Sequence, residues 1–432
     1  MIINRSLWLL PLCVLLFAGD ILAQDRKEAT STTVLDLPSL LDEVRENNPD
    51  LRASRLEADA LALRRSQVAS LPDPSVGITY QPYPLFTARG SQRSQWRVEQ
   101  AVPFPGKLGL RGDIADFGAE IASYEALTFE EDLLFETKKA YYELYRIQQQ
   151  QILILAFQER LGDFEANAAT QYVVGTGMQQ SILKAQLERN ALSQRLIALN
   201  LQKRSTTEAL ARLLNREVSE VAVEELKAPL IPATEEKELL ALALEQRPEA
   251  KALNAAHKRT EAQIALAGKE FFPDFGFNIT YFDVGTASIP ATATGRDALA
   301  IGVSVKIPFW RGRLRAQLAE ARTRKEQVGA RIEGLDAAFK TQINDLISQL
   351  TQESEQLTLF REALIPQAET TLQATVSSYT TGRTDFLDLL DAERMLFSLQ
   401  TGYEDTFARY MKAVAALERT LGVSSLSEIE SF

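Results

Sequence analysis

Two carboxylates near the C-terminal end are the side chains of this sequence whose spacing could do chemistry. Asp388 and Asp391 are three residues apart, so on a helix they occupy one face, one turn from each other. If several copies meet at a narrow point, such a pair makes a ring that favours cations. Taken alone, the pair is more typical of a solvated acidic face, and both interpretations stay open here.

The rest of the sequence gives no support for catalysis or metal binding. It contains no nucleophile elbow, no phosphate-binding loop and no group of acid, base and nucleophile at a recognisable spacing. His257 is the only histidine, and the four methionines include Met1, so nitrogen and sulfur ligands are scarce. We therefore expect no enzymatic activity, no cofactor and no metal site.

The composition indicates an ordered, acidic protein. The 432 residues are 45% hydrophobic and 24% charged, and the net charge is −11. A negatively charged protein is a poor match for a phosphate backbone, so nucleic acid is not an expected partner.

Residues 1–23 have the features of a secretory signal peptide. Arg5 precedes an apolar run, Leu7 to Ala18, that is too short to cross a bilayer, and cleavage is expected near Ala23. Cys13, the only cysteine, lies in that run, so the mature chain is expected to have neither thiol nor disulfide. Lipidation at Cys13 is a weaker alternative, because it leaves almost no apolar core before the cut.

The remaining chain consists of two copies of one unit, residues 24–214 and 235–432, joined by a linker at 215–234. Four landmarks recur in the same order, roughly 200 residues apart. They are Asn48-Pro49 with Arg247-Pro248, LPDPSVGITY with FPDFGFNITY, VPFPGKLGL with IPFWRGRLR, and YVVG with YTTG.

Each copy predicts a helix, a β-hairpin and then long helices. The opening helices are expected at Leu40–Ser70 and Lys237–Glu270. Apolar residues then alternate with polar ones, which predicts strands at about 75–86, 94–103, 274–284 and 298–308. Beyond the hairpins the spacing becomes three and four, which predicts helices that reach roughly 100 Å, with a break at Pro366. Glycine-bearing turns reverse them, and returning helices end near Leu214 and Leu421.

The four strands of one chain cannot form a stable sheet by themselves. Four strands with one apolar face bury too little surface and leave open edges, whereas a closed membrane barrel exposes the apolar face to lipid and has no edges. The smallest such barrels have about eight strands, so the chain is expected to oligomerise, as two copies or three. The alternative is an ordinary sheet packed on a helical layer in a soluble α+β domain.

This doubled arrangement resembles the TolC-type outer-membrane efflux proteins over essentially the whole mature chain. NPDLRASRLEADAL and VPFPGKLGLR are most similar to the cation and heavy-metal branch, the CzcC- and CusC-like proteins. The resemblance implies a fold that is mainly α with transmembrane β. It further implies a homotrimer with a twelve-stranded barrel in outer-membrane lipid and a helical tube that holds most of the mass in the periplasm of a Gram-negative-type cell.

The resemblance also implies roles for individual residues. It places Asp388 and Asp391 at a periplasmic constriction. The strand-to-helix junctions at the membrane surface would contain Pro103, Gly106, Pro308 and Gly312. The tips of the helical hairpins would contact a periplasmic adaptor, and they comprise Tyr172, Val174, Gly175, Thr176, Gly177, Tyr379, Gly382, Arg383 and Thr384.

The function expected from the resemblance is a passive exit duct that serves an inner-membrane pump of the RND type through an adaptor, or membrane fusion protein. A type I secretion duct and a periplasmic coiled-coil structural protein remain alternatives. The sequence does not identify the cargo, which could be metal ions, small drugs or a polypeptide.

Overall fold

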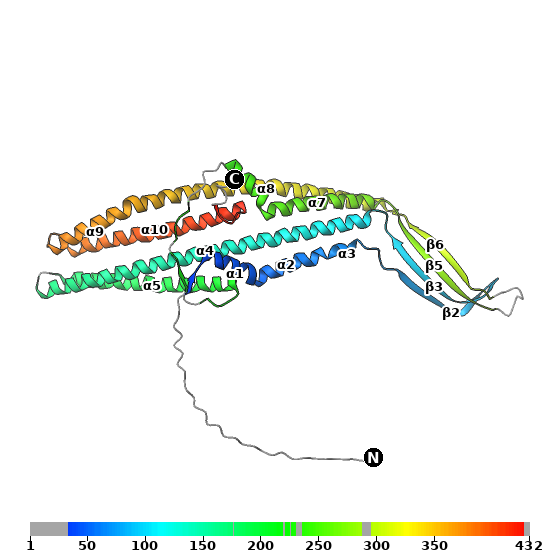
Figure 1. Ribbon diagram of the computed structural model, residues 1–432, viewed down its shortest axis with the longest axis horizontal. Coiled ribbons are helices and arrows are strands. Elements are labelled where there is room, and N and C mark those ends of the chain that lie inside the picture. The colour runs from blue at the N-terminus through cyan, green and yellow to red at the C-terminus, as the bar shows by residue number, and fades with distance from the viewer. Residues whose placement is uncertain are drawn as a thin grey trace, which may run out of the picture.

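A computed structural model describes residues 33–175, 177–218, 221–224, 226–229, 236–286 and 295–426. The predicted signal peptide with Cys13, the tip residue Thr176 and parts of the predicted linker lie outside these ranges. The described chain is long and narrow, with helices along most of its length and a β-sheet at one end (Figure 1).

The first half runs from entry helices through one hairpin to one pair of long helices. Its elements are β1 (Thr33–Leu35), α1 (Leu37–Asn47), α2 (Pro49–Ala62), α3 (Arg64–Val68), β2 (Ser75–Thr87), β3 (Gly90–Val102), α4 (Lys107–Val173) and α5 (Gln179–Leu214).

The second half repeats this order, with its outgoing long helix interrupted. Its elements are β4 (Val221–Val223), α6 (Glu236–Gln246), α7 (Pro248–Lys269), β5 (Asp274–Gly285), β6 (Ala298–Lys306), α8 (Arg311–Leu359), the π-helical turn η1 (Phe360–Leu364), α9 (Ile365–Thr380) and α10 (Phe386–Leu421). The short strand β4 pairs in parallel with β1, which ties the connection between the halves to the start of the first.

The prediction of one continuous entry helix in each copy is wrong. The chain leaves helical geometry at Asn48 (φ −69°, ψ 120°) and at Arg247 (φ −65°, ψ 131°), because a proline disfavours helical geometry in the residue before it. Pro49 and Pro248 then begin new helices, where their missing N–H costs nothing. The Asn48 side chain caps α2 and donates to the carbonyl of Leu213 (2.9 Å), which fixes this break against the end of α5.

The break predicted at Pro366 takes the form of a π-helical turn. Because Pro366 has no N–H to give, the helix widens just before it, and the N–H of Ile365 bonds to the carbonyl of Phe360. The Phe360 ring lies against Gly402 of α10, where a Cβ atom would stand 3.2 Å from the ring. The π-helical turn therefore packs at a defined position on the neighbouring helix, α10.

The four long strands form one antiparallel sheet in the order β2-β3-β5-β6. The two hairpins are joined through β3 and β5, so the halves share a continuous sheet. The first hairpin extends further than the alternation indicated: β3 begins at Gly90, ahead of the predicted 94, and only two residues separate it from β2. The prolines of this segment stand in β2, an edge strand, which tolerates residues without an N–H.

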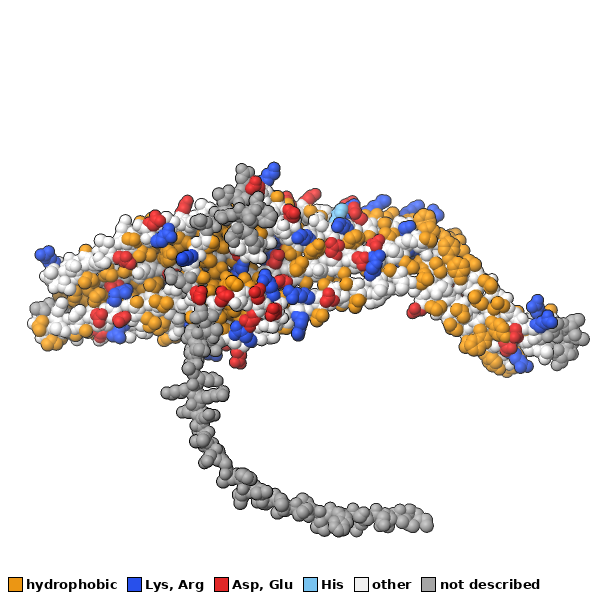
Figure 2. All heavy atoms as spheres, in the orientation of Figure 1, with side chains coloured by type: hydrophobic (Ala, Val, Ile, Leu, Met, Phe, Trp, Pro, Cys, Tyr) orange, Lys and Arg blue, Asp and Glu red, His pale blue; other side chains and the backbone are white. Residues whose placement is uncertain are grey.

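In the part of the chain that the structure describes, no helix covers the apolar face of this sheet. Ile301 is 77% exposed and Val76 is 67% exposed, and Figure 2 shows hydrophobic side chains gathered over the strands. A sheet packed on a helical layer buries one face, so the soluble α+β alternative does not describe this chain.

The cores lie between the long helices. The predicted seam residues Ile154, Phe157 and Leu161 of α4 are all fully buried, and Phe157 packs on Phe397 of α10 with ring centroids 5.1 Å apart. Burying each such side chain stabilises the fold by about 1.5–3 kcal/mol. A second core around Tyr141 and Tyr410 lies at mid-length, where the entry helices α1 and α6 also pack. Within the described ranges, no helix carries a stretch long and apolar enough to cross a bilayer.

Candidate functional site

The two helical hairpins end in tips that lie close together at the end opposite the sheet (Figure 1). Each reversal depends on a glycine with positive φ, Gly175 (+79°) and Gly382 (+68°). Their N–H groups donate to the carbonyls of Tyr172 and Tyr379, both at 3.0 Å, so the two tips turn in the same way. This geometry explains why the spacing Y-x-x-G recurs.

A direct contact links the tips. The Tyr379 hydroxyl donates to the side-chain oxygen of Gln171 (3.3 Å), and the Tyr379 ring stands edge-on to Phe386 at 6.1 Å. A groove of about 380 Å³ lies between the tips, and its lining includes Gly177, Lys184 and Thr384.

The surfaces of the tips differ in chemistry. On the first tip, Val174 is 67% exposed and Tyr172 and Met178 are also exposed. On the second tip the exposed positions are glycine and polar residues, with Arg383 prominent. The end of the protomer therefore presents an apolar surface beside a polar one.

Asp388 and Asp391 lie on the first turns of α10, just past the second tip, and both are exposed. Asp388 accepts a hydrogen bond from Thr384, while Asp391 is 3.6 Å from Arg394 on its own helix. Arg394 also pairs with Glu188 of α5, so the charge of Asp391 is partly balanced and that of Asp388 is not met by a cation among the described residues.

The first strand-to-helix junction is built around Gly106 and Lys107. Gly106 has φ +88° and precedes α4, and the Lys269 side chain lies where a Cβ would be. Lys107 is 1% exposed, and its ammonium group contacts Asp274 (2.8 Å), Glu270 (3.4 Å) and the carbonyl of Phe272 (3.3 Å). Pro103 ends the strand before this turn.

Lys107 therefore connects the two repeats, and sequence reasoning did not single it out. Asp274 also accepts from the N–H of Phe104, whose ring stacks on Phe272 with centroids 4.7 Å apart. Two features of the sequence could have indicated this contact: the lysine directly after VPFPG, and the Pro-Asp step that opens both hairpins.

The second junction differs from the first, although the sequence suggested equivalence. Gly312 is the second residue of α8, has no positive φ and has open space around its Cα. After Pro308, Phe309 and Trp310 are each 82% exposed, whereas Phe104 is partly buried. The glycine requirement thus belongs to the first junction alone.

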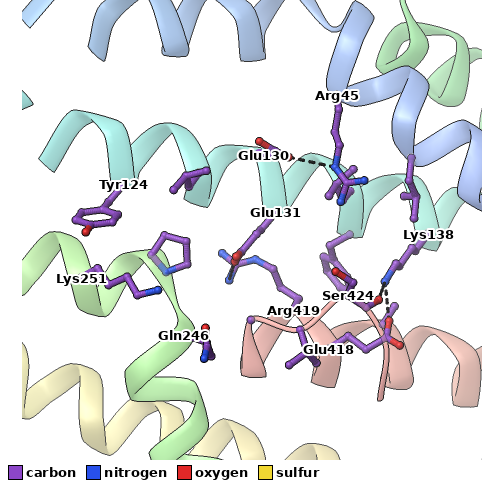
Figure 3. Close-up of a pocket in the computed structure, with 18 residues that line it drawn as sticks. Arg45, Tyr124, Glu130, Glu131, Lys138, Gln246, Lys251, Glu418, Arg419 and Ser424 are labelled. Carbon is purple, nitrogen blue, oxygen red and sulfur yellow. Dashed lines mark hydrogen bonds and ion pairs between the residues drawn. The ribbon is translucent and has the colours of Figure 1, made fainter. Parts of the chain in front are cut away.

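A pocket of about 290 Å³ that both apolar and charged side chains line lies at mid-length between α4, α7 and α10 (Figure 3). Burial raises the pKa of Glu131 to about 7; Arg419 opposes that rise, and Glu249 and two neighbouring acids on α4 add to it. Glu131 faces Arg419 at 3.5 Å. The pocket is part of the packing between the repeats.

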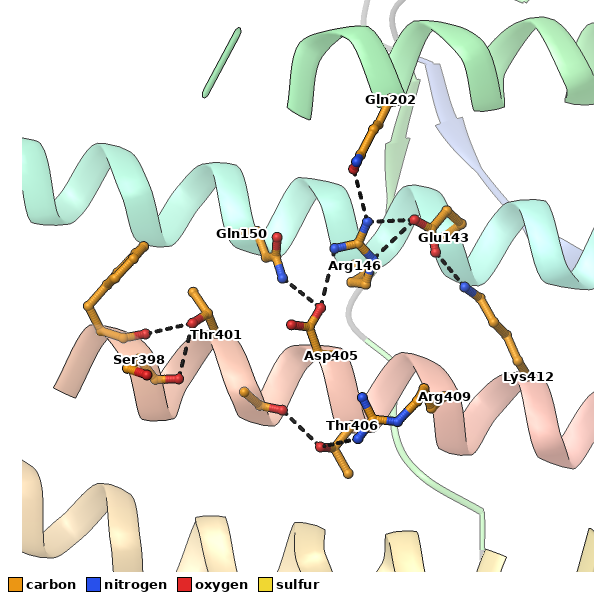
Figure 4. Close-up of polar contacts among 12 residues, drawn as sticks. Glu143, Arg146, Gln150, Gln202, Ser398, Thr401, Asp405, Thr406, Arg409 and Lys412 are labelled. Carbon is orange, nitrogen blue, oxygen red and sulfur yellow. Dashed lines mark hydrogen bonds and ion pairs between the residues drawn. The ribbon is translucent and has the colours of Figure 1, made fainter. Parts of the chain in front are cut away.

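A network of charges joins α4 to α10 nearby (Figure 4). Arg146 contacts Glu143 and Asp405, and Asp405 also accepts from Gln150 (2.7 Å). Burial raises the pKa of the Glu143 carboxyl, but hydrogen bonds from Arg146 and Lys412 outweigh this, so its pKa is below the usual range. These contacts hold the helices together, and among the described residues no three or more His, Cys, Asp or Glu side chains gather as metal ligands.

Comparisons with known proteins agree on one family. Residues 239–423 match the family model described as "Outer membrane efflux protein". The outer membrane protein TolC of Vibrio cholerae is 22% identical over 91% of this chain and 92% of its own length. The cobalt-zinc-cadmium resistance protein CzcC of Cupriavidus metallidurans is 21% identical, with 90% of each chain covered.

The fold is likewise shared. The solved structure of the transmembrane channel protein CusC superposes with a TM-score of 0.76 at 17% identity, and the alignment covers 90% of this chain and 92% of that one. At this identity the likeness establishes the fold alone. The family match over the second repeat and the doubled helix–hairpin–helix order thus make the chain similar to the TolC-type outer-membrane efflux proteins.

Proposed function

We propose that this protein is the outer-membrane exit channel of an efflux system. One observation carries the proposal: a four-stranded sheet with an uncovered apolar face is continuous with helical hairpins that extend away from it. Lipid is the environment that stabilises such a face, and closure with other copies removes its edges. Three copies supply twelve strands, a number that leaves a lumen. The protein conducts passively and catalyses no reaction.

The organisation we propose is a signal peptide at 1–23, repeats at 24–214 and 235–432, and a linker at 215–234. The junction residues Pro103, Gly106, Pro308 and Gly312 then mark the inner surface of the outer membrane, where strands pass into tube helices. The recurrence of the hairpin and of the positive-φ tip glycines supports this division.

We propose that the tips receive a periplasmic adaptor which links the channel to an inner-membrane pump of the RND type. The exposed apolar first tip, with Tyr172 and Val174, beside the polar second tip, with Arg383, supports a docking role. Cations are the favoured cargo, because CzcC is named for resistance to cobalt, zinc and cadmium. A type I secretion duct would need the same fold, so it is the likeness to CzcC that favours cations over a polypeptide.

Asp388 and Asp391 form the constriction in this proposal. In a trimer each position contributes three carboxylates around one axis, and like charges that close favour cations in the pore. Asp388 carries the larger effect, since Arg394 partly balances Asp391.

Single-channel recording in planar bilayers tests both the channel and the constriction. Replacing Asp388 and Asp391 by Ala should raise conductance and weaken cation selectivity, with Asp388→Ala alone producing most of the change. The matched control is Glu57→Ala with Asp59→Ala, two exposed acids on α2, a helix that lies away from the tips (Figure 1). Equal currents in wild type and the Asp388/Asp391 variant would count against the constriction. A protein that forms no pores at all would favour the coiled-coil structural alternative.

A further inference from the structure

The described protomer leaves two strand edges unpaired. In the order β2-β3-β5-β6, the outer edges belong to β2 and β6, and unpaired backbone groups at an edge are a template for another strand. On the proposed function, which this inference requires, those edges meet in the trimer. The pairing of β3 with β5 inside one chain indicates how these edges pair between copies.

The two hairpins have the same register. In the recurring motifs, Val76 corresponds to Phe277 and Val98 to Val303. Val76 lies opposite Val98 in the first hairpin, and Phe277 lies opposite Val303 in the second. The correspondence between the copies therefore holds residue by residue from Ser75 to Tyr80, before the register of the first hairpin shifts.

The register in which β3 pairs with β5, at the interface between the repeats, can then be applied to the two unpaired edges. Because β6 corresponds to β3 and β2 to β5, we propose that β6 of one copy pairs antiparallel with β2 of the next in the register of β3 and β5. In that register Val98 faces Ile279, so Val303 faces Ile78 of the neighbouring copy. By the same correspondence Ile301 faces Tyr80, and Val305 faces Val76.

The chemistry of the two edges supports this register. All six residues are apolar and exposed in the protomer, from 48% for Val305 to 77% for Ile301. A slip of one residue would set the apolar side chains of one strand beside the polar face of the other. Pro82 and Pro84, which cannot donate a backbone hydrogen bond, lie beyond the paired stretch.

The two junctions extend the same interface below the sheet. Phe104 stacks on Phe272 within the protomer, and their counterparts are Phe309, which is 82% exposed, and Leu71, which is 51% exposed. Phe309 thus packs on Leu71 of the next copy, beside the exposed carboxylate of Asp73. The counterpart of buried Lys107 is Gly312, so the contact between copies lacks the ammonium group that fastens the contact within one copy.

Pairs of engineered cysteines test the register, in a mature chain that contains no cysteine of its own after residue 23. Val305→Cys with Val76→Cys, and Ile301→Cys with Tyr80→Cys, should form disulfides that convert monomer bands to linked dimers and trimers on non-reducing gels. The controls exchange partners: Val305→Cys with Tyr80→Cys, and Ile301→Cys with Val76→Cys. These pairs are four residues out of register, about 13 Å along the strand, which is beyond disulfide reach.

Each result has a separate meaning. Within one protomer β2 and β6 stand about 14 Å apart across three strand spacings, so any disulfide must join two copies. Linking of the exchanged pairs in place of the matched pairs would overturn the register while leaving the trimer intact. A monomeric mass of the wild-type protein in detergent would instead sink the proposed function.

Phe309→Ala tests the junction. It should lower the temperature at which the trimer dissociates in detergent, whereas Tyr83→Ala, an exposed aromatic near the opposite end of β2, should not. If both variants dissociate like the wild type, Phe309 faces lipid and the junction contact is wrong. If matched cysteines link normally at the same time, the strand register stands without it.

Discussion

Lys107 is the single side chain on which the junction between the repeats depends most. Its ammonium group is buried, and three acceptors from the α7–β5 connection surround it. Breaking a buried ion pair from one side leaves an uncompensated charge, here that of Asp274. The effect should therefore exceed that of a surface lysine.

We predict that Lys107→Met lowers the free energy of unfolding by roughly 3 kcal/mol. Lys325→Met, which removes an exposed pair with Glu261 at 2.8 Å, is the matched control and should cost much less, because solvent screens the pair. Denaturant unfolding followed by circular dichroism measures both. Equal losses in the two variants would show that the buried contact carries no special weight.

Glu404 of α10 is a residue whose protonation should couple stability to pH. One of its carboxylate oxygens is buried without a hydrogen-bond partner among the described residues. Burial, with a smaller contribution from Asp405, raises its pKa from 4.5 to about 7. The folded protein therefore holds this proton at pH values where the unfolded chain has lost it, and stability falls as pH rises from about 4.5 to 7.

We predict that Glu404→Gln raises the free energy of unfolding at pH 8 by about 1–2 kcal/mol, allowing for partial exposure, and changes it little at pH 4. Thermal unfolding midpoints at the two pH values provide the measurement, with exposed Glu355→Gln as the control. A gain of the same size at both pH values would contradict the assignment of the raised pKa.

At the scale of elements, the π-helical turn η1 and Gly402 form a matched pair. The wide turn before Pro366 directs Phe360 toward α10, where a Cβ at position 402 would stand 3.2 Å from the ring and require the ring to shift. Most other helix glycines of the second repeat have no such reason, since Gly329 and Gly334 of α8 have open space at the Cβ position.

We predict that Gly402→Leu destabilises the fold by about 1–3 kcal/mol, because the new side chain must displace Phe360 from a packed contact. Gly334→Leu is the control and should stabilise α8 by up to about 1 kcal/mol through helix propensity. Chemical denaturation of the two variants decides between them. If both substitutions stabilise the protein, Phe360 is not tightly packed against position 402.

At the scale of the whole molecule, the sheet and the helices are stabilised in different ways. The long helices bury their seams within one chain, with Ile154 and Leu161 fully buried. The strands do not, since Ile301 and its neighbours remain exposed. Within one protomer the helices thus bury their apolar seams, whereas the sheet leaves its apolar face exposed. This difference is the physical basis for the proposed assembly in lipid.

The amino-acid sequence was sufficient to predict the order of elements, the repeat and the resemblance to outer-membrane efflux proteins. Periodicity is local and the Y-x-x-G spacing encodes a turn that needs positive φ, so the strands, the seam at Ile154 and the tips at Gly175 and Gly382 could be predicted. The breaks at Asn48 and Arg247 follow from Pro49 and Pro248, a local effect that the helical periodicity of the entry segments concealed. The partners of Lys107 and the difference between the junctions at Gly106 and Gly312 became visible in the folded chain alone. They depend on contacts between segments about 165 residues apart, and no local pattern records which partner a side chain will meet.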